Sequence, residues 1–270
     1  MAIKAADVKK LRDATGAGMM DAKKALTEAE GDFDKAVDLL RVAGAAKAAK
    51  RSDREASNGL VAASGHALVH IGSETDFVAK NAEFMATADQ IAQAVENAEA
   101  DGKDAAGAVE LPDGQTVSET LAALAVKIGE KIELADAAYF GGTAEVYLHR
   151  RSQDLPPQVG VMVEYTGDDV ATVHGVCLQI AAMSPRWLTR GEVPAEVIEH
   201  ERTVARDIAL EEGKPEKIID RIVDGRLNGF YKENCLLEQA AVSDDKKTVE
   251  KILTEAGVTV TRFVRFSAGD

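Results

Sequence analysis

The side chains of this sequence that could act on a substrate are few, and their spacing points away from catalysis. His66 and His70 are four residues apart, a spacing that forms a metal pair when both imidazoles lie on one face of a helix. They fall within a predicted β-hairpin, so no metal site is expected there. Cys177 lies in an apolar stretch typical of a buried helix face. Neither a phosphate-binding loop nor a Gly-x-Gly-x-x-Gly turn occurs. The sequence therefore favours a protein that is not an enzyme and that binds no nucleotide, metal or other cofactor itself.

The strongest functional signal is a polar bend that surrounds one aromatic residue. Residues 73–81 combine acidic and helix-capping side chains around Phe77. The residues before this bend alternate as in a strand, and from Ala82 onwards apolar residues recur at helical spacing. The bend is thus a predicted strand-to-helix corner, a place where scaffolds present functional side chains. Two interpretations stay open: Phe77 is an exposed contact for a partner, or it is a hydrophobic staple folded against the next helix, with Thr75 or Asp76 as the cap.

Residues 1–43 are predicted to form a three-helix docking bundle. The first helix ends at Gly16 and the second at Gly31, and Asp32 caps the third. A unit of this size has little core of its own, which favours a role in docking. Two methionines at the glycine-rich turn fit either the core or an exposed, soft apolar contact: Met19 and Met20.

Two later stretches share one order of predicted elements, namely hairpin, helix, helix and strand. The first core half covers residues 58–140, and the second covers residues 141–192 and 236–270. Thr116 and Thr248 stand at equivalent helix starts. The predicted fold class is therefore α+β, with an N-terminal three-helix, ubiquitin-associated-like bundle followed by a duplicated α+β core that carries an inserted antiparallel helical hairpin.

Two connecting stretches have a different character. Residues 44–57 are rich in Ala, Lys and Arg, and they are predicted to form a solvated helical linker, with a nucleic-acid-binding patch as the alternative. Residues 98–115 are acidic and contain glycine, so a loop is expected there.

The insertion at residues 193–235 carries two helical patterns separated by a Gly-Lys-Pro turn. Val197, Val204 and Ile208 mark the apolar face predicted for its first helix. Arms of about 18 residues would extend about 27 Å. The insertion either projects as an association surface or packs as a lid on the second core half.

Composition narrows the class of partner. The chain has 270 residues, 46% of them hydrophobic, which is enough for real cores. Lys and Arg number 32 against 46 Asp and Glu, a net charge of −14 that argues against nucleic acid as the main ligand and favours a protein partner. The two cysteines are far apart, and the sequence shows neither an apolar leader nor a membrane span. A cytoplasmic protein is expected.

Two long motifs resemble signatures of the elongation factor Ts family, the nucleotide-exchange factors of elongation factor Tu. They are Leu-Arg-Asp-Ala-Thr-Gly-Ala-Gly-Met-Met-Asp-Ala-Lys-Lys-Ala-Leu at residues 11–26 and Thr-Asp-Phe-Val-Ala-Lys-Asn at residues 75–81. Residues 193–197, 212–215 and 262–266 are also similar, in the family's order, so the resemblance covers nearly the whole chain.

The resemblance implies a guanine-nucleotide exchange factor for elongation factor Tu in translation elongation. Such a factor binds the GDP-bound and nucleotide-free forms, displaces Mg²⁺ and promotes GDP release so that GTP can bind. By linkage, tighter binding to the nucleotide-free form weakens GDP binding by the same ratio. The resemblance assigns the displacement of Mg²⁺ to the corner, with Phe77 as a wedge in the GTPase domain, and the residues concerned are Thr75, Asp76, Phe77 and Val78.

Two further contacts are implied by the resemblance. The bundle would clamp another face of the GTPase domain through Leu11, Arg12, Met19 and Met20. The second core half would reach a different domain of elongation factor Tu through Gln179 and Ile180. No direct nucleic-acid or membrane partner is expected, and self-association through the helical hairpin is left open.

Two other classes compete with this assignment. The bundle also resembles ubiquitin-associated modules, with residues 18–20 at the loop those modules use, which would suit a non-catalytic docking or adaptor protein. A metal-dependent enzyme built on the histidines is the third class.

Overall fold

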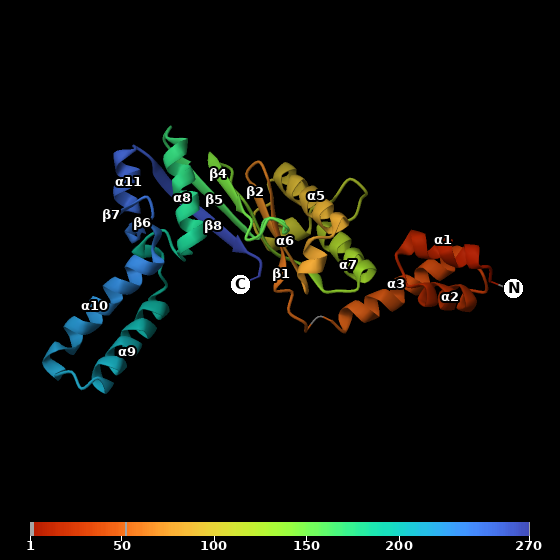
Figure 1. The fold of residues 1–270 in the computed structure, drawn as a ribbon, viewed down its shortest axis with the longest axis horizontal. Coiled ribbons are helices and arrows are strands. Elements are labelled where there is room, and N and C mark those ends of the chain that lie inside the picture. The colour runs from red at the N-terminus through yellow and green to blue at the C-terminus, as the bar shows by residue number, and fades with distance from the viewer. Residues whose placement is uncertain (1–2, 52, 270) are drawn as a thin grey trace. The chain divides into compact units, whose positions relative to one another are not determined.

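The computed structural model describes residues 3–51 and 53–269 as a mixture of helices and sheets (Figure 1). The chain divides into two compact units. The second unit is built from Phe140–His149 and Gly160–Arg265, and the first from the other described residues. None of the helices among these residues combines the length and the apolar character that crossing a membrane requires.

The N-terminal bundle has the three predicted helices: α1 (Ala5–Thr15), α2 (Met19–Glu28) and α3 (Phe33–Ala49). Gly16 ends α1 with a left-handed φ of 68°, which glycine adopts without steric strain. The Asp32 carboxylate accepts the Lys35 N–H at 3.0 Å and so caps α3, as predicted. The bundle core is small and consists of Val8, Leu11, Ala22, Ala25, Leu26, Ala29 and Ala36.

The predicted helical linker is helical only as far as Ala49. Residues 53–57 form turn and irregular backbone, and Ser52 lies outside the described residues. Tertiary contacts hold this segment out of a helix, because Lys131 Nζ donates to the Arg54 carbonyl at 3.0 Å and Arg54 pairs with Glu74 at 2.9 Å.

The first core sheet has the antiparallel order β1-β2-β3, formed by β1 (Asn58–Ser64), β2 (Ala67–Ser73) and β3 (Ile132–Tyr139). The tight turn between β1 and β2 confirms the predicted hairpin. Three helices pack against this sheet: α5 (Ala82–Ala98), α6 (Lys103–Gly107) and α7 (Val117–Ile128). Their apolar faces and the sheet share one core, which includes Ile71, Phe84 and Leu124.

Helix α6 lies within residues 98–115, where the expectation of a loop was wrong. Ala106 is fully buried, and the Ser118 hydroxyl donates to the Gly107 carbonyl at 2.9 Å. Burial against β3 and this side-chain bond stabilise a helix of five residues that has too few turns to form by itself.

The second unit repeats the topology of the first core. Its sheet has the order β4-β5-β8, formed by β4 (Ala144–His149), β5 (Val159–Thr166) and β8 (Thr259–Ser267). The helices α8 (Val170–Met183) and α11 (Val249–Glu255) follow the hairpin in the predicted order. Thr116 and Thr248 each accept the backbone N–H three residues later, so the two predicted helix starts are equivalent. The duplicated α+β core is thereby confirmed.

The second unit also contains short elements that were not predicted. A two-stranded ribbon joins β6 (Ala240–Ala241) and β7 (Asp244–Thr248). Two 3₁₀ turns, Arg190–Glu192 and Leu236–Glu238, flank the inserted helices.

The insertion forms the predicted antiparallel pair, α9 (Ala195–Glu211) and α10 (Glu216–Asn234) (Figure 1). The face predicted for α9 was wrong, because Val204 and Ile208 are exposed. Ala205 and Ala209 are buried instead, against three larger residues of α10: Ile219, Val223 and Leu227. Small side chains let the two helices approach closely. The buried face of α9 is therefore the one that carries the alanines, each one residue after a valine or isoleucine of the predicted face.

Candidate functional site

The corner at residues 73–81 is built from two successive capped helix starts. After β2 ends, the Thr75 hydroxyl accepts the Val78 N–H at 3.4 Å and begins the single-turn helix α4 (Asp76–Ala79). The Asn81 side chain then accepts the N–H groups of Glu83 and Phe84 at 2.9 and 3.1 Å, and so begins α5. The Thr and Asn of the motif therefore turn the chain twice within a few residues.

Phe77 is 79% exposed at the apex of this corner. The two residues after it, Val78 and Ala79, are buried on the core side of α4. Each helical residue is rotated by about 100° from the last, so burying these two turns Phe77 away from the core. The staple interpretation was wrong, and the phenyl ring is free for a partner.

The charges around the corner are paired. Asp76 bonds Lys80 at 3.0 Å, and the Lys80 ammonium lies 6.0 Å from the centre of the Phe77 ring. Glu74 accepts the Lys131 N–H at 2.6 Å and the Arg54 guanidinium at 2.9 Å. The Lys131 N–H, with a smaller contribution from Arg54, lowers the pKa of the Glu74 carboxyl below its ordinary value. The apolar apex is thus surrounded by a polar frame without a strong net charge.

The bundle places its predicted contact residues in two environments. Met20 is 76% and Met19 47% exposed on the first turn of α2, so the methionines face outwards. Arg12 is also at the surface, 3.3 Å from the Asp13 carboxylate. Leu11 is fully buried in the bundle core. Its side chain therefore holds the bundle together and offers no surface to a partner.

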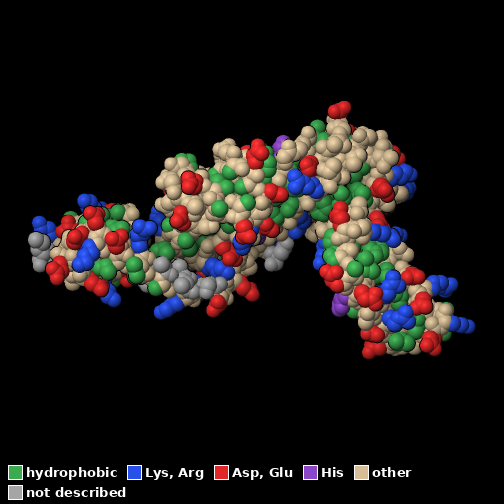
Figure 2. Space-filling view, turned by 180° about the vertical axis from the view of Figure 1, so that it is seen from behind, with side chains coloured by type: hydrophobic (Ala, Val, Ile, Leu, Met, Phe, Trp, Pro, Cys, Tyr) green, Lys and Arg blue, Asp and Glu red, His purple; other side chains and the backbone are tan. Residues whose placement is uncertain are grey.

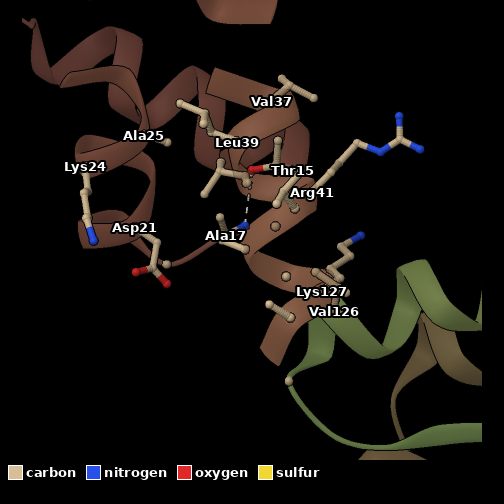
Figure 3. Close-up of a pocket in the computed structure, with 18 of the residues that line it drawn as sticks. Thr15, Ala17, Asp21, Lys24, Ala25, Val37, Leu39, Arg41, Val126 and Lys127 are labelled. Carbon is tan, nitrogen blue, oxygen red and sulfur yellow. Dashed lines mark hydrogen bonds between the residues drawn. The ribbon is translucent and has the colours of Figure 1, made fainter. Parts of the chain in front are cut away.

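A hollow of about 580 Å³ lies where the bundle meets α7 (Figure 3). Residues of all three bundle helices line it together with Val126 and Lys127 of α7. A Cβ atom at Gly16 would collide with Lys127, and one at Gly44 with Val126. The two glycines therefore allow the bundle to approach α7 closely.

In the second unit, both predicted contact residues are buried. The Gln179 amide donates to Gln239 Oε1 at 3.0 Å and to the Ala240 carbonyl at 3.1 Å. Its oxygen accepts the Val242 N–H at 2.7 Å. Gln179 thus joins α8 to the β6–β7 ribbon, and Ile180 packs inside the unit. The exposed apolar side chains beside them are Leu178, Met183 and Val242.

Replacing Gln179 by alanine is expected to destabilise the second unit by about 1–3 kcal/mol, because Gln239 and the Val242 N–H lose a buried partner. The matched control is Leu178→Ala, an exposed change on the same helix that should stay within about 0.5 kcal/mol. Trp187 is the single tryptophan and lies in this unit, so its fluorescence during urea unfolding measures both variants. Equal effects of the two substitutions would contradict the assignment of Gln179 to the fold.

Sequence reasoning missed the residues that hold the corner from outside the motif. Glu130 accepts hydrogen bonds from Thr75, and Lys131 bonds Glu74. Glu130 follows directly after Gly129, the residue that ends α7. The sequence shows that a helix ends there, but only the sheet register brings that end beside β2.

Comparison with known proteins gives a consistent match. The profile of the family described as Elongation factor TS matches residues 74–270. The chain is 78% identical to elongation factor Ts of Cutibacterium acnes over 270 residues, covering all of both chains. It is 58% and 57% identical to the elongation factor Ts proteins of Mycolicibacterium vanbaalenii and Mycolicibacterium gilvum, over 98% of this chain and 97% of each relative.

Proposed function

Because the chain belongs to the elongation factor Ts family, which implies nucleotide exchange on elongation factor Tu, we propose that it promotes GDP release by displacing Mg²⁺ through the Phe77 corner. The observation that carries this proposal is the exposure of Phe77 on a doubly capped corner whose next two residues are buried. An exchange factor alters a binding equilibrium and breaks no covalent bond in its substrate.

The physical basis of the proposal is reciprocal binding. A protein that binds nucleotide-free elongation factor Tu more tightly than the GDP form must weaken GDP binding by the same ratio. Full burial of an exposed phenylalanine side chain contributes about 2–3 kcal/mol, which is available only where a partner accepts the ring. Mg²⁺ demands near-ideal octahedral geometry, so a small shift of its ligands weakens its binding. Phe77 supplies the apolar insertion, Asp76 lies beside it, and Thr75 and Val78 anchor it.

The bundle forms a second contact in this proposal, through Arg12, Met19 and Met20. Methionine side chains are unbranched and adapt to irregular apolar surfaces. Leu11 contributes by holding α1 and α2 together, since it is buried in their core.

The second core half forms a third contact, with a different domain of elongation factor Tu. Gln179 and Ile180 support this surface from inside, and the exposed residues beside them make the contact: Leu178, Met183 and Val242. The protein is proposed to act in the cytoplasm. It is proposed to bind both the GDP-bound and the nucleotide-free forms of elongation factor Tu.

Self-association through the helical hairpin remains a prediction. Two exposed apolar residues of α9 support it, namely Val204 and Ile208. On the face shown in Figure 2, acidic and basic side chains are interspersed with apolar ones. Ion pairs within the hairpin neutralise part of that charge; Arg206, for example, pairs with Asp220 at 2.6 Å.

The test is stopped-flow release of a fluorescent GDP analogue from elongation factor Tu, with and without this protein, in buffer containing Mg²⁺ or EDTA. The protein is expected to accelerate release strongly in Mg²⁺ and much less in EDTA, where the metal has already been removed. If release is not accelerated at all, the exchange function fails. An equal acceleration in both buffers would leave exchange standing and overturn the Mg²⁺ route.

A further inference from the structure

We propose that Glu130 is a positioning residue that holds the Phe77 corner in its partner-binding conformation; this inference rests on the proposed function. Both oxygens of the Glu130 carboxylate accept hydrogen bonds from one residue of the corner, Thr75. Oε2 accepts the Thr75 N–H at 3.0 Å, and Oε1 accepts the Thr75 hydroxyl at 2.8 Å.

The fold aims Glu130 at the corner from a segment that is 55 residues away in the sequence. Gly129 ends α7 with a left-handed φ of 88°, and its N–H bonds the Ala125 carbonyl at 2.9 Å. The chain then turns into β3, which pairs with β2 and so runs beside the corner. Glu130 lies between Gly129, the residue that caps the end of α7, and Lys131, the residue that precedes β3.

The clamp is reciprocal. Glu130 reaches from the α7–β3 turn to Thr75, while Glu74 reaches from the corner back to the Lys131 N–H at 2.6 Å. Each carboxylate therefore bonds a backbone N–H of the opposite segment. Hydrogen bonds to ionised carboxylates are stronger than neutral ones, so the two together fix the position of the corner against the turn.

The Thr75 hydroxyl connects this clamp to Phe77. A hydroxyl has one donor and two acceptor positions. Its hydrogen is donated to Glu130, which leaves its oxygen free to accept the Val78 N–H and begin α4. Phe77 lies inside that single turn, and a helix of four residues has no stability of its own. Glu130 therefore sets the orientation of the cap on which the position of the phenyl ring depends.

If the Phe77 ring is already held in its bound position, less conformational entropy is lost when the complex forms, and binding is stronger. Without Glu130, the corner would sample other conformations, and the partner would have to select the productive one. The expected consequence is weaker exchange activity with an intact overall fold, because the sheet and α5 retain their core.

The chain offers a matched control for this clamp. Glu119 Oε2 accepts the N–H and the hydroxyl of Thr116 at 2.9 and 3.0 Å, so the same two donors of another helix-capping threonine are bound here by one carboxylate oxygen. Glu119 lies in the first turn of α7, whereas Glu130 follows the end of that helix. Glu119→Ala therefore reproduces the chemical change without touching the corner.

The experiment measures GDP release at subsaturating concentrations of Glu130→Ala, Glu119→Ala and the wild type. Glu130→Ala is expected to lower the acceleration about tenfold, the effect of losing a charge-assisted hydrogen bond. Glu119→Ala should stay within about twofold. Glu130→Gln retains one accepting oxygen and should recover part of the loss.

Two readouts separate positioning from a general loss of structure. In the Phe77→Ala background, Glu130→Ala should add almost no further loss, because residues that act through one group are not additive. A full additive loss would overturn the inference. Hydrogen exchange of the free protein should show faster exchange at residues 75–79 in Glu130→Ala only, and unchanged protection there would equally overturn it.

The second readout also separates this inference from the proposed function. If Phe77→Ala retains full exchange activity, the wedge fails. Hydrogen exchange at residues 75–79 then still decides whether Glu130 holds the corner.

Discussion

Phe77→Ala should lower the acceleration of GDP release by about 30-fold, the size of effect seen when an interface residue worth 2 kcal/mol or more is truncated. The ring is the most exposed of the large apolar side chains among the described residues, and it projects from a backbone that is fixed on both sides. In the proposed complex with elongation factor Tu, this exposed ring becomes buried. Its loss should therefore appear in exchange and binding rather than in folding.

The control for this substitution is Leu210→Ala, which removes an exposed apolar side chain from α9. Both variants should keep the wild-type circular dichroism spectrum and melting temperature, since exposed truncations change stability by about 0.5 kcal/mol or less. Stopped-flow GDP release then compares them directly. If Phe77→Ala matches Leu210→Ala in activity, the corner is not the wedge, and the bundle or the second core half must carry exchange.

Leu11→Ala should destabilise the bundle by about 2–5 kcal/mol, the usual cost of leaving a cavity in place of a buried leucine. The bundle core is small, so this loss is a large part of its total stability. Amide hydrogen exchange across α1 to α3 should rise strongly in this variant. Exchange activity should fall as well, because the contact surface proposed on α2 is no longer held in place.

Met20→Ala is the matched substitution at the surface of the same bundle. It should leave hydrogen exchange in α1 to α3 unchanged while weakening binding to elongation factor Tu, measured by titration of the nucleotide-free form. Protection of the bundle that falls equally in both variants would contradict the distinction between Leu11 as core and Met20 as contact.

The sequence alone determined most of the elements of this protein, because their signals are local. Glycines at the ends of helices, Thr75, Asn81 and Thr116 as caps, and the alternation of the strands act through neighbouring residues. The repeated order of hairpin, helix and strand could be predicted for the same reason. The motif at residues 75–81 also located the corner, although its residues alone left the orientation of Phe77 open.

Tertiary structure decided what depends on contacts between distant residues. Helix α6 forms where it packs against β3 and Ala106 is buried in the shared core, and the buried face of α9 is set by how closely α10 can approach. Leu11 and Gln179 lie within motifs that suggest contact, yet packing places both in cores. The orientation of Phe77 and the clamp from Glu130 likewise require β2 and β3 to be paired. Local sequence specifies where a helix starts, but which side chains reach a partner is decided by the pairing of segments far apart in the chain.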